Sequence, residues 1–168
     1  MGYTTDFDGK IDIVPPLNEK EIEYLSKFAD SRRMNRENGE YYVGGTGMLG
    51  QGDDEDIIDY NTPPSSQPSL WCQWIPTDDG TAIVWDGNEK FYESPQWMKF
   101  LIEHFLKPDS IAKKTNKHFS FLQGHILNGE IYAQGEDGDD CWILKVTDNK
   151  VSVVELEVQR VEANSYEV

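Results

Sequence analysis

Aromatic and aliphatic positions concentrate in residues 70–106, and this stretch predicts the centre of the protein. Two apolar runs, residues 70–75 and 81–85, flank a Thr-Asp-Asp-Gly turn at residues 77–80. Aromatic and β-branched residues on either side of an Asp-Gly pair are typical of a β-hairpin. Large aromatic side chains bury much apolar area, so we expect this hairpin and the helix after it to form the core. Four tryptophans lie in the stretch: Trp71, Trp74, Trp85 and Trp97.

A first helix is predicted from Asn18, because Asn18 and Glu21 have the spacing of a capping box. Its apolar side chains recur with the spacing of one helix face, at Ile22, Leu25, Phe28 and Ala29. Three arginines follow and are expected in the last turns, where cations suit the helix dipole: Arg32, Arg33 and Arg36. Gly39 marks the expected end of this segment.

A second helix is predicted after residue 93. Ser94 is the expected cap, and Pro95 fits the first helical position. The apolar spacing of a helix face then continues to Phe105. Because a proline disfavours helix in the residue before it, the helix should end at Lys107, which precedes Pro108.

Strand patterns lie on both sides of the helices. Residues 10–14 alternate apolar and polar side chains, as a half-buried strand does. Asn128–Gly129 is a strong hairpin dipeptide, so we expect it to join strands at residues 119–127 and 130–134. The remaining strand candidates are residues 41–43 and a last hairpin of residues 141–147 and 151–158 around Asp148–Asn149.

The order of these elements predicts one α+β domain over residues 1–161, with an antiparallel sheet and two helices on one face. Its two strand–helix passages suggest a ferredoxin-like core with added β-hairpins. Residues 44–68 form a long loop rich in Gly, Pro and Asp, with a helical turn expected at residues 57–60. Loops of this length are usually functional or disordered. Residues 162–168 are expected to be a frayed C-terminal tail.

Acidic residues outnumber basic ones by 31 to 15, which gives a formal net charge of −16. This charge argues against direct nucleic-acid binding, because phosphate contacts need clustered Lys and Arg. It permits an acidic surface that engages a protein partner with a basic surface. The plainer interpretation is that acidity keeps the protein soluble and monomeric, or a small oligomer.

Sequence features also bear on the compartment. The two cysteines, Cys72 and Cys141, do not make a disulfide framework and are expected to be buried, inert thiols. The first residues lack the basic start and apolar run of a signal peptide. No apolar segment approaches the ~20 residues that span a bilayer. We therefore expect a cytoplasmic protein that does not bind membranes.

Residues 45–50 match the G-x-G-x-x-G pattern of dinucleotide-binding loops, but their context differs. That fingerprint needs a helix opening on the glycines, whereas another glycine and four acids at residues 53–56 follow here. These acids would repel phosphate. A flexible loop is therefore favoured, and phosphate binding by residues 44–52 stays open as an alternative.

No metal, cofactor or catalytic constellation is predicted. The acidic clusters at residues 53–56 and 137–140 lack the ligand spacing of an EF-hand loop, so solvated turns are favoured and weak Mg²⁺ or Ca²⁺ binding is the alternative. The histidines and cysteines lack zinc spacing, and no nucleophile motif such as G-x-S-x-G occurs. The histidines are His104, His118 and His125. The sequence therefore favours a protein that is not an enzyme.

One mixed group of aromatic and polar residues remains as a candidate binding site. Strand alternation puts Trp71 and Gln73 on the opposite side from Cys72 and Trp74. An aromatic beside a polar amide suits a small ligand or a peptide. The alternative is an amphipathic sheet face covered by the long loop. The candidate binding residues are Trp71, Gln73, Glu89, Lys90, Tyr92, Gln134 and Glu136.

Several short motifs together resemble those of a family of small uncharacterised proteins from bacteria and their phages. The motifs are Gly2-Tyr3-Thr4-Thr5-Asp6-Phe7, Arg32-Arg33-Met34, Leu70-Trp71-Cys72-Gln73-Trp74 and Glu89-Lys90-Phe91. The resemblance extends from residue 2 to about residue 149 and implies no activity, so no catalytic residues carry over. The Trp-rich strand and helix are also loosely similar to ferredoxin-like domains of small phage proteins, a likeness of architecture alone.

The sequence thus favours a non-enzymatic binding or interaction protein, related to phage proteins, whose acidic surface engages a basic or host protein. One variant of this hypothesis is mimicry of DNA, but the acids are scattered over turns and helix faces. The alternative is a small-ligand or nucleotide-binding protein, or an enzyme. It would use the loop of residues 44–52 and the polar face around Gln73, Glu89 and Lys90.

Overall fold

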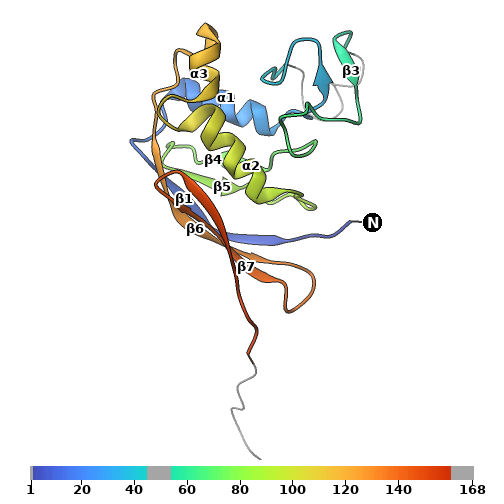
Figure 1. Cartoon of the computed structure of the whole chain (residues 1–168), viewed down its shortest axis with the longest axis vertical. Helices are drawn as coiled ribbons and strands as arrows, with labels where there is room; N and C mark the ends of the chain where they lie inside the picture. The colour runs from blue at the N-terminus through green and yellow to red at the C-terminus, as the bar shows by residue number, and fades with distance from the viewer. Residues whose placement is uncertain (1, 45–53, 160–168) are drawn as a thin grey trace, which may run out of the picture.

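A six-stranded antiparallel sheet carries the helices in the computed structural model, which describes residues 2–44 and 54–159. Figure 1 shows the helices gathered on one side of this sheet. The strands are β1 (Asp6–Val14), β4 (Trp74–Pro76), β5 (Ala82–Trp85), β6 (Ile126–Gln134), β7 (Cys141–Thr147) and β8 (Lys150–Glu155). The helical segments are α1 (Glu19–Ala29), α2 (Ser94–Leu101), η1 (Ile102–Leu106), α3 (Ile111–Thr115) and η2 (Lys117–Phe119). A separate two-stranded sheet pairs β2 (Asn35–Arg36) with β3 (Ile57–Asp59).

The strand order of the large sheet is β4-β5-β1-β6-β7-β8, and each neighbouring pair is antiparallel. Along the chain, α1 links β1 to β4, and α2 begins the connection from β5 to β6. This order and these directions are those of the β-α-β-β-α-β ferredoxin-like motif. The strands β7 and β8 extend that core as an added hairpin. The expected α+β fold with an antiparallel sheet is confirmed.

The core lies between the helices and one face of the sheet. Alternation along β1 buries Phe7, Ile11 and Ile13, while the residues between them are exposed. The neighbouring β6 repeats this pattern with Leu127 and Ile131. From the helical side, the core receives Leu25, Phe28, Trp97, Met98, Leu101 and Phe105.

Trp74 joins the edge of the sheet to the second helix. Its side chain is 1% exposed and makes edge-to-face contacts with Phe7 and Phe91, whose ring centroids lie 5.1 and 5.0 Å away. The indole Nε1 donates a 2.8 Å hydrogen bond to the backbone oxygen of Ser94, the first residue of α2. This bond satisfies the indole N–H, which a buried tryptophan otherwise leaves unpaired.

The first helix begins as expected but ends earlier. The Glu21 amide donates to Asn18 Oδ1, and the Asn18 amide donates to Glu21 Oε1, so the capping box is confirmed. The helix ends at Ala29, and its expected extension through the arginines is wrong. Arg33 and Arg36 are instead buried beyond the helix. Their guanidinium groups donate hydrogen bonds to backbone oxygens and carboxylates of the following loop. Such charge-assisted bonds are stronger than the interaction of an exposed cation with a helix dipole.

Three further local expectations are wrong. Residues 57–60 do not form a helical turn, because Ile57–Asp59 pairs as β3 with β2. Residues 41–43 are not a strand, and Tyr41 instead packs its ring against Phe105 at 5.2 Å. Ser94 does not cap α2, since Glu93 holds that position in a left-handed conformation. The predicted end at Lys107 is confirmed by its extended backbone.

The Asn128–Gly129 dipeptide lies inside β6 and does not turn a hairpin as expected. Gly129 is needed there because β1 approaches closely: an added Cβ would lie 2.6 Å from the Lys10 backbone oxygen. Asp148–Asn149 does join β7 to β8, with φ angles of 45° and 70°. Two consecutive positive φ angles fit a tight hairpin turn.

We expect Trp74→Ala to destabilise the protein by about 3–5 kcal/mol, because it removes a fully buried indole and its hydrogen bond. Urea unfolding followed by circular dichroism measures this loss. Trp71→Ala is the matched control, since Trp71 is only half-buried, and it should cost clearly less. Equal losses for the two variants would contradict the role assigned to Trp74.

Candidate functional site

A groove of about 1140 Å³ lies beside the edge strand β4. It is formed by the C-terminal end of α1, the segment from residue 61 to residue 71, the start of β4 and the segment that follows β5. Alternate residues of one extended stretch, Trp71, Gln73 and Ile75, contribute to its wall. Trp74, between them, points into the core. The same alternation that anchors the hairpin therefore aims its neighbours at the groove.

The structure brings together five of the seven residues that the sequence nominates as a binding site. Those that line the groove are Trp71, Gln73, Glu89, Lys90 and Tyr92. Gln134 and Glu136 lie elsewhere, at the turn between β6 and β7. The Gln134 amide donates to backbone oxygens of that turn, and Glu136 Oε1 accepts a 2.8 Å bond from the Thr4 amide. These two residues hold the turn and the N-terminal segment.

Gln73 is the buried polar residue of the groove. Its side chain is 8% exposed, and its Nε2 donates a 3.2 Å hydrogen bond to the backbone oxygen of Glu89. That carbonyl can only accept, so the bond fixes which end of the amide faces it. Within the described residues, the other end, Oε1, has no hydrogen-bond partner. A buried acceptor left unpaired costs about 1–3 kcal/mol, and a bound donor would recover this cost.

Backbone pairing places a carboxylate beside this amide. The Asp86 amide donates a 3.0 Å bond to the Gln73 backbone oxygen, continuing the register of β4 and β5. Side chains directly opposite each other in an antiparallel pair share one face, with Cβ atoms about 5 Å apart. Both side chains line the groove. Asp86 Oδ1 accepts a 2.9 Å bond from the Asn88 amide, which orients the carboxylate.

Aromatic and apolar side chains form much of the remaining wall. Trp71 is half-buried and Tyr92 is 47% exposed, so both present aromatic surface. The Ser69 hydroxyl lies 3.4 Å from the backbone oxygens of both residues and accepts a 2.7 Å bond from the indole of Trp97, a core residue. Pro63, Pro68 and Leu70 complete the apolar part of the lining.

The charged residues of the groove favour a cation. The acids of the lining are Asp30, Asp86 and Glu89, and its bases are Lys27 and Lys90. Lys27 forms an exposed ion pair with Glu23 at 2.9 Å. Asp30 is the C-cap of α1, and the carbonyl end of a helix carries a partial negative charge.

Within residues 2–44 and 54–159, the other sequence candidates form neither a metal cluster nor a reactive thiol. The glycine pattern at residues 45–50, the acid at residue 53 and the tail at residues 162–168 lie outside the described residues. No group of three metal-binding side chains comes together in residues 2–44 and 54–159. Cys72 and Cys141 are buried free thiols, and burial raises the pKa of Cys72 to about 12. A thiol with so high a pKa is a poor nucleophile.

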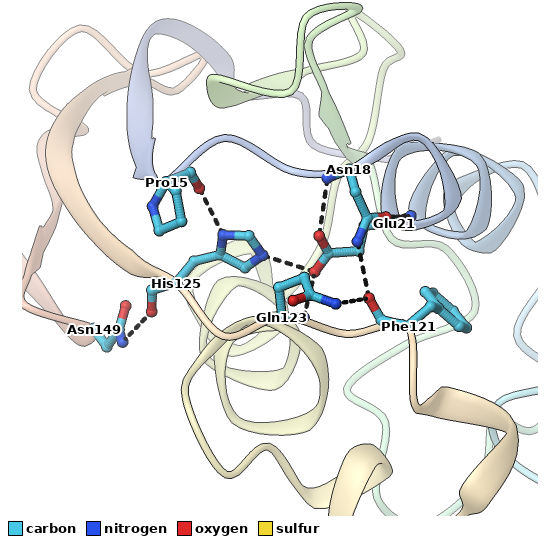
Figure 2. A network of polar contacts seen from close by, with 7 residues as sticks. All are labelled: Pro15, Asn18, Glu21, Phe121, Gln123, His125 and Asn149. Carbon is cyan, nitrogen blue, oxygen red and sulfur yellow. Dashed lines mark hydrogen bonds and ion pairs between the residues drawn. The ribbon is translucent and has the colours of Figure 1, made fainter.

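A buried acid–base pair lies away from the groove and was not signalled by the sequence (Figure 2). His125 Nε2 lies 2.7 Å from Glu21 Oε2, and its Nδ1 lies 2.6 Å from the Pro15 backbone oxygen. Both side chains are fully buried. Glu21 also accepts bonds from the Asn18 and Gln123 amides, at 2.9 and 3.2 Å. Every oxygen and nitrogen of the pair is thus engaged, which indicates a structural role.

The two pKa values of this pair shift toward the charged forms. Burial alone would raise the pKa of Glu21, but hydrogen bonds from His125 and the backbone lower it below its ordinary value. Burial alone would lower the pKa of His125, but bonds to Glu21 and Pro15 raise it. Since both acceptors face ring nitrogens, the geometry fits an imidazolium that donates twice. The pair joins the start of α1 to the start of β6.

A second histidine forms a half-buried pair on the other helix. His104 Nδ1 lies 2.6 Å from the Tyr41 hydroxyl, and its ring stacks on Phe100 at 3.9 Å. Burial lowers the pKa of His104 and raises that of Tyr41. A neutral imidazole that accepts a hydrogen bond from the Tyr41 hydroxyl anchors this residue to η1. Neither side chain lines the groove.

No protein-family model, curated protein or solved structure matches this chain. The resemblance to small bacterial and phage proteins is therefore still an expectation from its motifs. In residues 2–44 and 54–159, no helix has the length and apolar character needed to cross a bilayer.

The stability contributed by the Glu21–His125 pair should depend on pH in both directions. The raised pKa of His125 contributes stability that is complete below the ordinary value of 6.5 and is lost as pH rises through the raised value. The lowered pKa of Glu21 contributes stability that is complete above 4.5 and is lost as pH falls through the lowered value. Both contributions are therefore complete between these two ordinary values.

We expect His125→Gln to cost about 3–5 kcal/mol in that window, because it leaves a buried carboxylate without its charged partner. The cost should shrink toward alkaline pH and toward acid pH. Urea unfolding of both proteins across a pH series measures it. His118→Gln is the control, since His118 is exposed and should leave the profile unchanged. A cost that does not vary with pH would show that His125 is neutral in the native state.

Proposed function

We propose that this protein is a non-enzymatic binding protein whose groove beside β4 engages a protein partner with a basic surface. The observation that carries the proposal is Gln73, a buried amide in the groove wall with an acceptor oxygen that no described residue satisfies. Native proteins pair nearly all buried polar atoms, so an unpaired acceptor in the wall of a groove favours a bound donor. The aromatic wall beside it is typical of the anchor pockets of interfaces.

The acidic character of the whole chain supports a basic partner. Its net charge of −16 would steer a positively charged protein toward it and repel acidic ones. The groove itself carries the same sign, because three acids line it against two lysines. A phage-related, cytoplasmic role fits the motif resemblance and remains part of the proposal.

The arrangement of reactive groups favours binding over catalysis. The Glu21–His125 and Tyr41–His104 pairs engage each other inside the fold and do not line the groove. A general base must reach a substrate proton, and neither pair is positioned to do so at that site. A nucleotide is the less favourable guest, since the carboxylates of the groove would repel its phosphates.

We expect Trp71→Ala to weaken binding of the partner by about 30-fold, the loss typical of an aromatic hot spot. The partner is isolated by affinity capture on the immobilised protein at low salt. Its dissociation constant is then measured with purified components by calorimetry. Affinity should also fall as the salt concentration rises, because charged surfaces contribute to the encounter.

Tyr132→Ala is the matched control. Tyr132 is 40% exposed and lies between the buried Ile131 and Ala133 of β6, so it faces away from the core and is not part of the groove. Its removal should leave the dissociation constant unchanged. A partner that binds wild type and Trp71→Ala equally would place the interface elsewhere and overturn the proposal.

A further inference from the structure

We infer that the occupant of the groove is an arginine side chain on an extended segment of the partner, with its guanidinium against Trp71 and an N–H donated to Gln73 Oε1. This inference rests on the proposed function and specifies the chemistry of the guest. It follows from three properties of the groove: an unpaired buried acceptor, adjacent negative charge and an aromatic wall.

The unpaired acceptor requires a donor group. Gln73 Oε1 can accept from N–H or O–H, but a carboxylate or phosphate guest offers neither. The amide cannot rotate to present its nitrogen instead, because Nε2 is held by the Glu89 backbone oxygen at 3.2 Å. The guest must therefore bring an N–H or O–H to an oxygen that is itself buried.

The adjacent charge selects a cationic donor over a neutral one. Asp86 lies directly across the hairpin from Gln73, and a carboxylate can accept bonds on both of its oxygens. One oxygen, Oδ1, is occupied by the Asn88 amide at 2.9 Å. A guest cation between Gln73 and Asp86 would donate one hydrogen bond to the amide oxygen and one to the carboxylate, and both would be charge-assisted, which is the stronger kind. Asp30 at the carbonyl end of α1 adds to the same field.

The aromatic wall favours arginine over lysine. A guanidinium is planar, stacks on aromatic faces and carries five donors in a fixed fork, whereas an ammonium is a compact and strongly hydrated charge. The protein stabilises its own arginines in this way. Arg32 lies 4.2 Å from the ring centroid of Tyr60, and Arg33 lies 4.1 Å from that of Phe28. Trp71 offers a comparable face in the wall that also contains Gln73, and the apolar side chains of the same lining can cover the aliphatic stem of an arginine.

The size of the groove indicates that the arginine belongs to a longer chain. A volume of about 1140 Å³ exceeds what one side chain fills and lies just above the usual range for small-ligand sites. The apolar part of the lining, formed by Pro63, Pro68 and Leu70, is available for residues that flank the arginine. A free guanidinium compound would leave this part of the groove empty.

The test uses the full chain and three acetylated, amidated peptides of sequence Gly-Leu-X-Leu-Gly, in which X is arginine, lysine or citrulline. Binding is followed by NMR titration of the Gln73 side-chain amide and the Trp71 indole. We expect the arginine peptide to shift both signals. The citrulline peptide should bind about tenfold more weakly, since it keeps the shape but loses the charge. The lysine peptide should also bind more weakly than the arginine peptide.

Variants separate the two hydrogen bonds. Gln73→Met keeps the length of the side chain without the acceptor, and Asp86→Asn keeps the shape without the charge. Each should weaken the arginine peptide about tenfold. Tyr132→Ala should leave it unchanged. Thermal melting checks that the variants fold, and Asp86→Asn, on the partly exposed face, decides the result if Gln73→Met unfolds.

The outcomes distinguish failure of the arginine inference from failure of the proposed binding function. Equal binding of the arginine and citrulline peptides, or no shift of the Gln73 amide, overturns the arginine inference. If the captured partner still requires Trp71 but tolerates replacement of its arginines, the proposed function stands and the inference fails. If no peptide shifts a groove signal and Trp71→Ala leaves partner binding intact, both fail. Binding of free N-acetyl-arginine amide as tightly as the peptide would also overturn the inference, because it assigns the site to a small cation.

Discussion

The burial of Trp74 is the interaction on which the arrangement of this protein depends. One indole contacts β1 through Phe7, contacts the segment before α2 through Phe91, and bonds the first residue of α2 itself. It therefore connects the sheet edge to the helical layer at one point. Because aromatic pairs are worth about 0.5–1.5 kcal/mol beyond their area burial, the anchoring is specific as well as hydrophobic. With Trp74 fixed inward, the side chains on either side of it must point the other way.

The groove follows from that alternation. Gln73 and Ile75 flank the buried indole and are aimed at the space beside β4, where α1 ends and two irregular segments pass. Interfaces and ligand sites often lie on loops that a rigid scaffold positions. This groove has loop segments on one side and the regular elements β4 and α1 on the other. Its polar atoms are held by backbone pairing and not by long flexible contacts, so they are pre-organised for a guest. The unpaired acceptor lowers the free energy of unfolding, and the packed core beneath the groove offsets this loss.

Buried charges in this fold are used to join distant segments. His125 and Glu21 connect the start of β6 to the start of α1, and Arg33 binds the Glu40 and Tyr42 backbone oxygens at 2.8 Å. Each charge is desolvated, but most of its donors or acceptors are satisfied, which is the condition under which buried ions are tolerated. These contacts fix irregular segments of the chain that no helix or strand hydrogen bonds hold in place.

Local chemistry in the sequence determined the capping box at Asn18, the helix end before Pro108, the tight turn at Asp148–Asn149, and which side chains of residues 71–75 share a face. These depend on neighbours within a few residues, so propensity and periodicity suffice. Tertiary structure alone decided the rest. The Asn128–Gly129 pair lies inside a strand, where β1 is too close to Gly129 for a side chain. Arg33 and Arg36 lie beyond the end of the helix and bind a loop. Likewise, the groove, the unpaired oxygen of Gln73 and the Glu21–His125 pair exist only because segments far apart in sequence meet, and their separation hides such contacts from any local pattern.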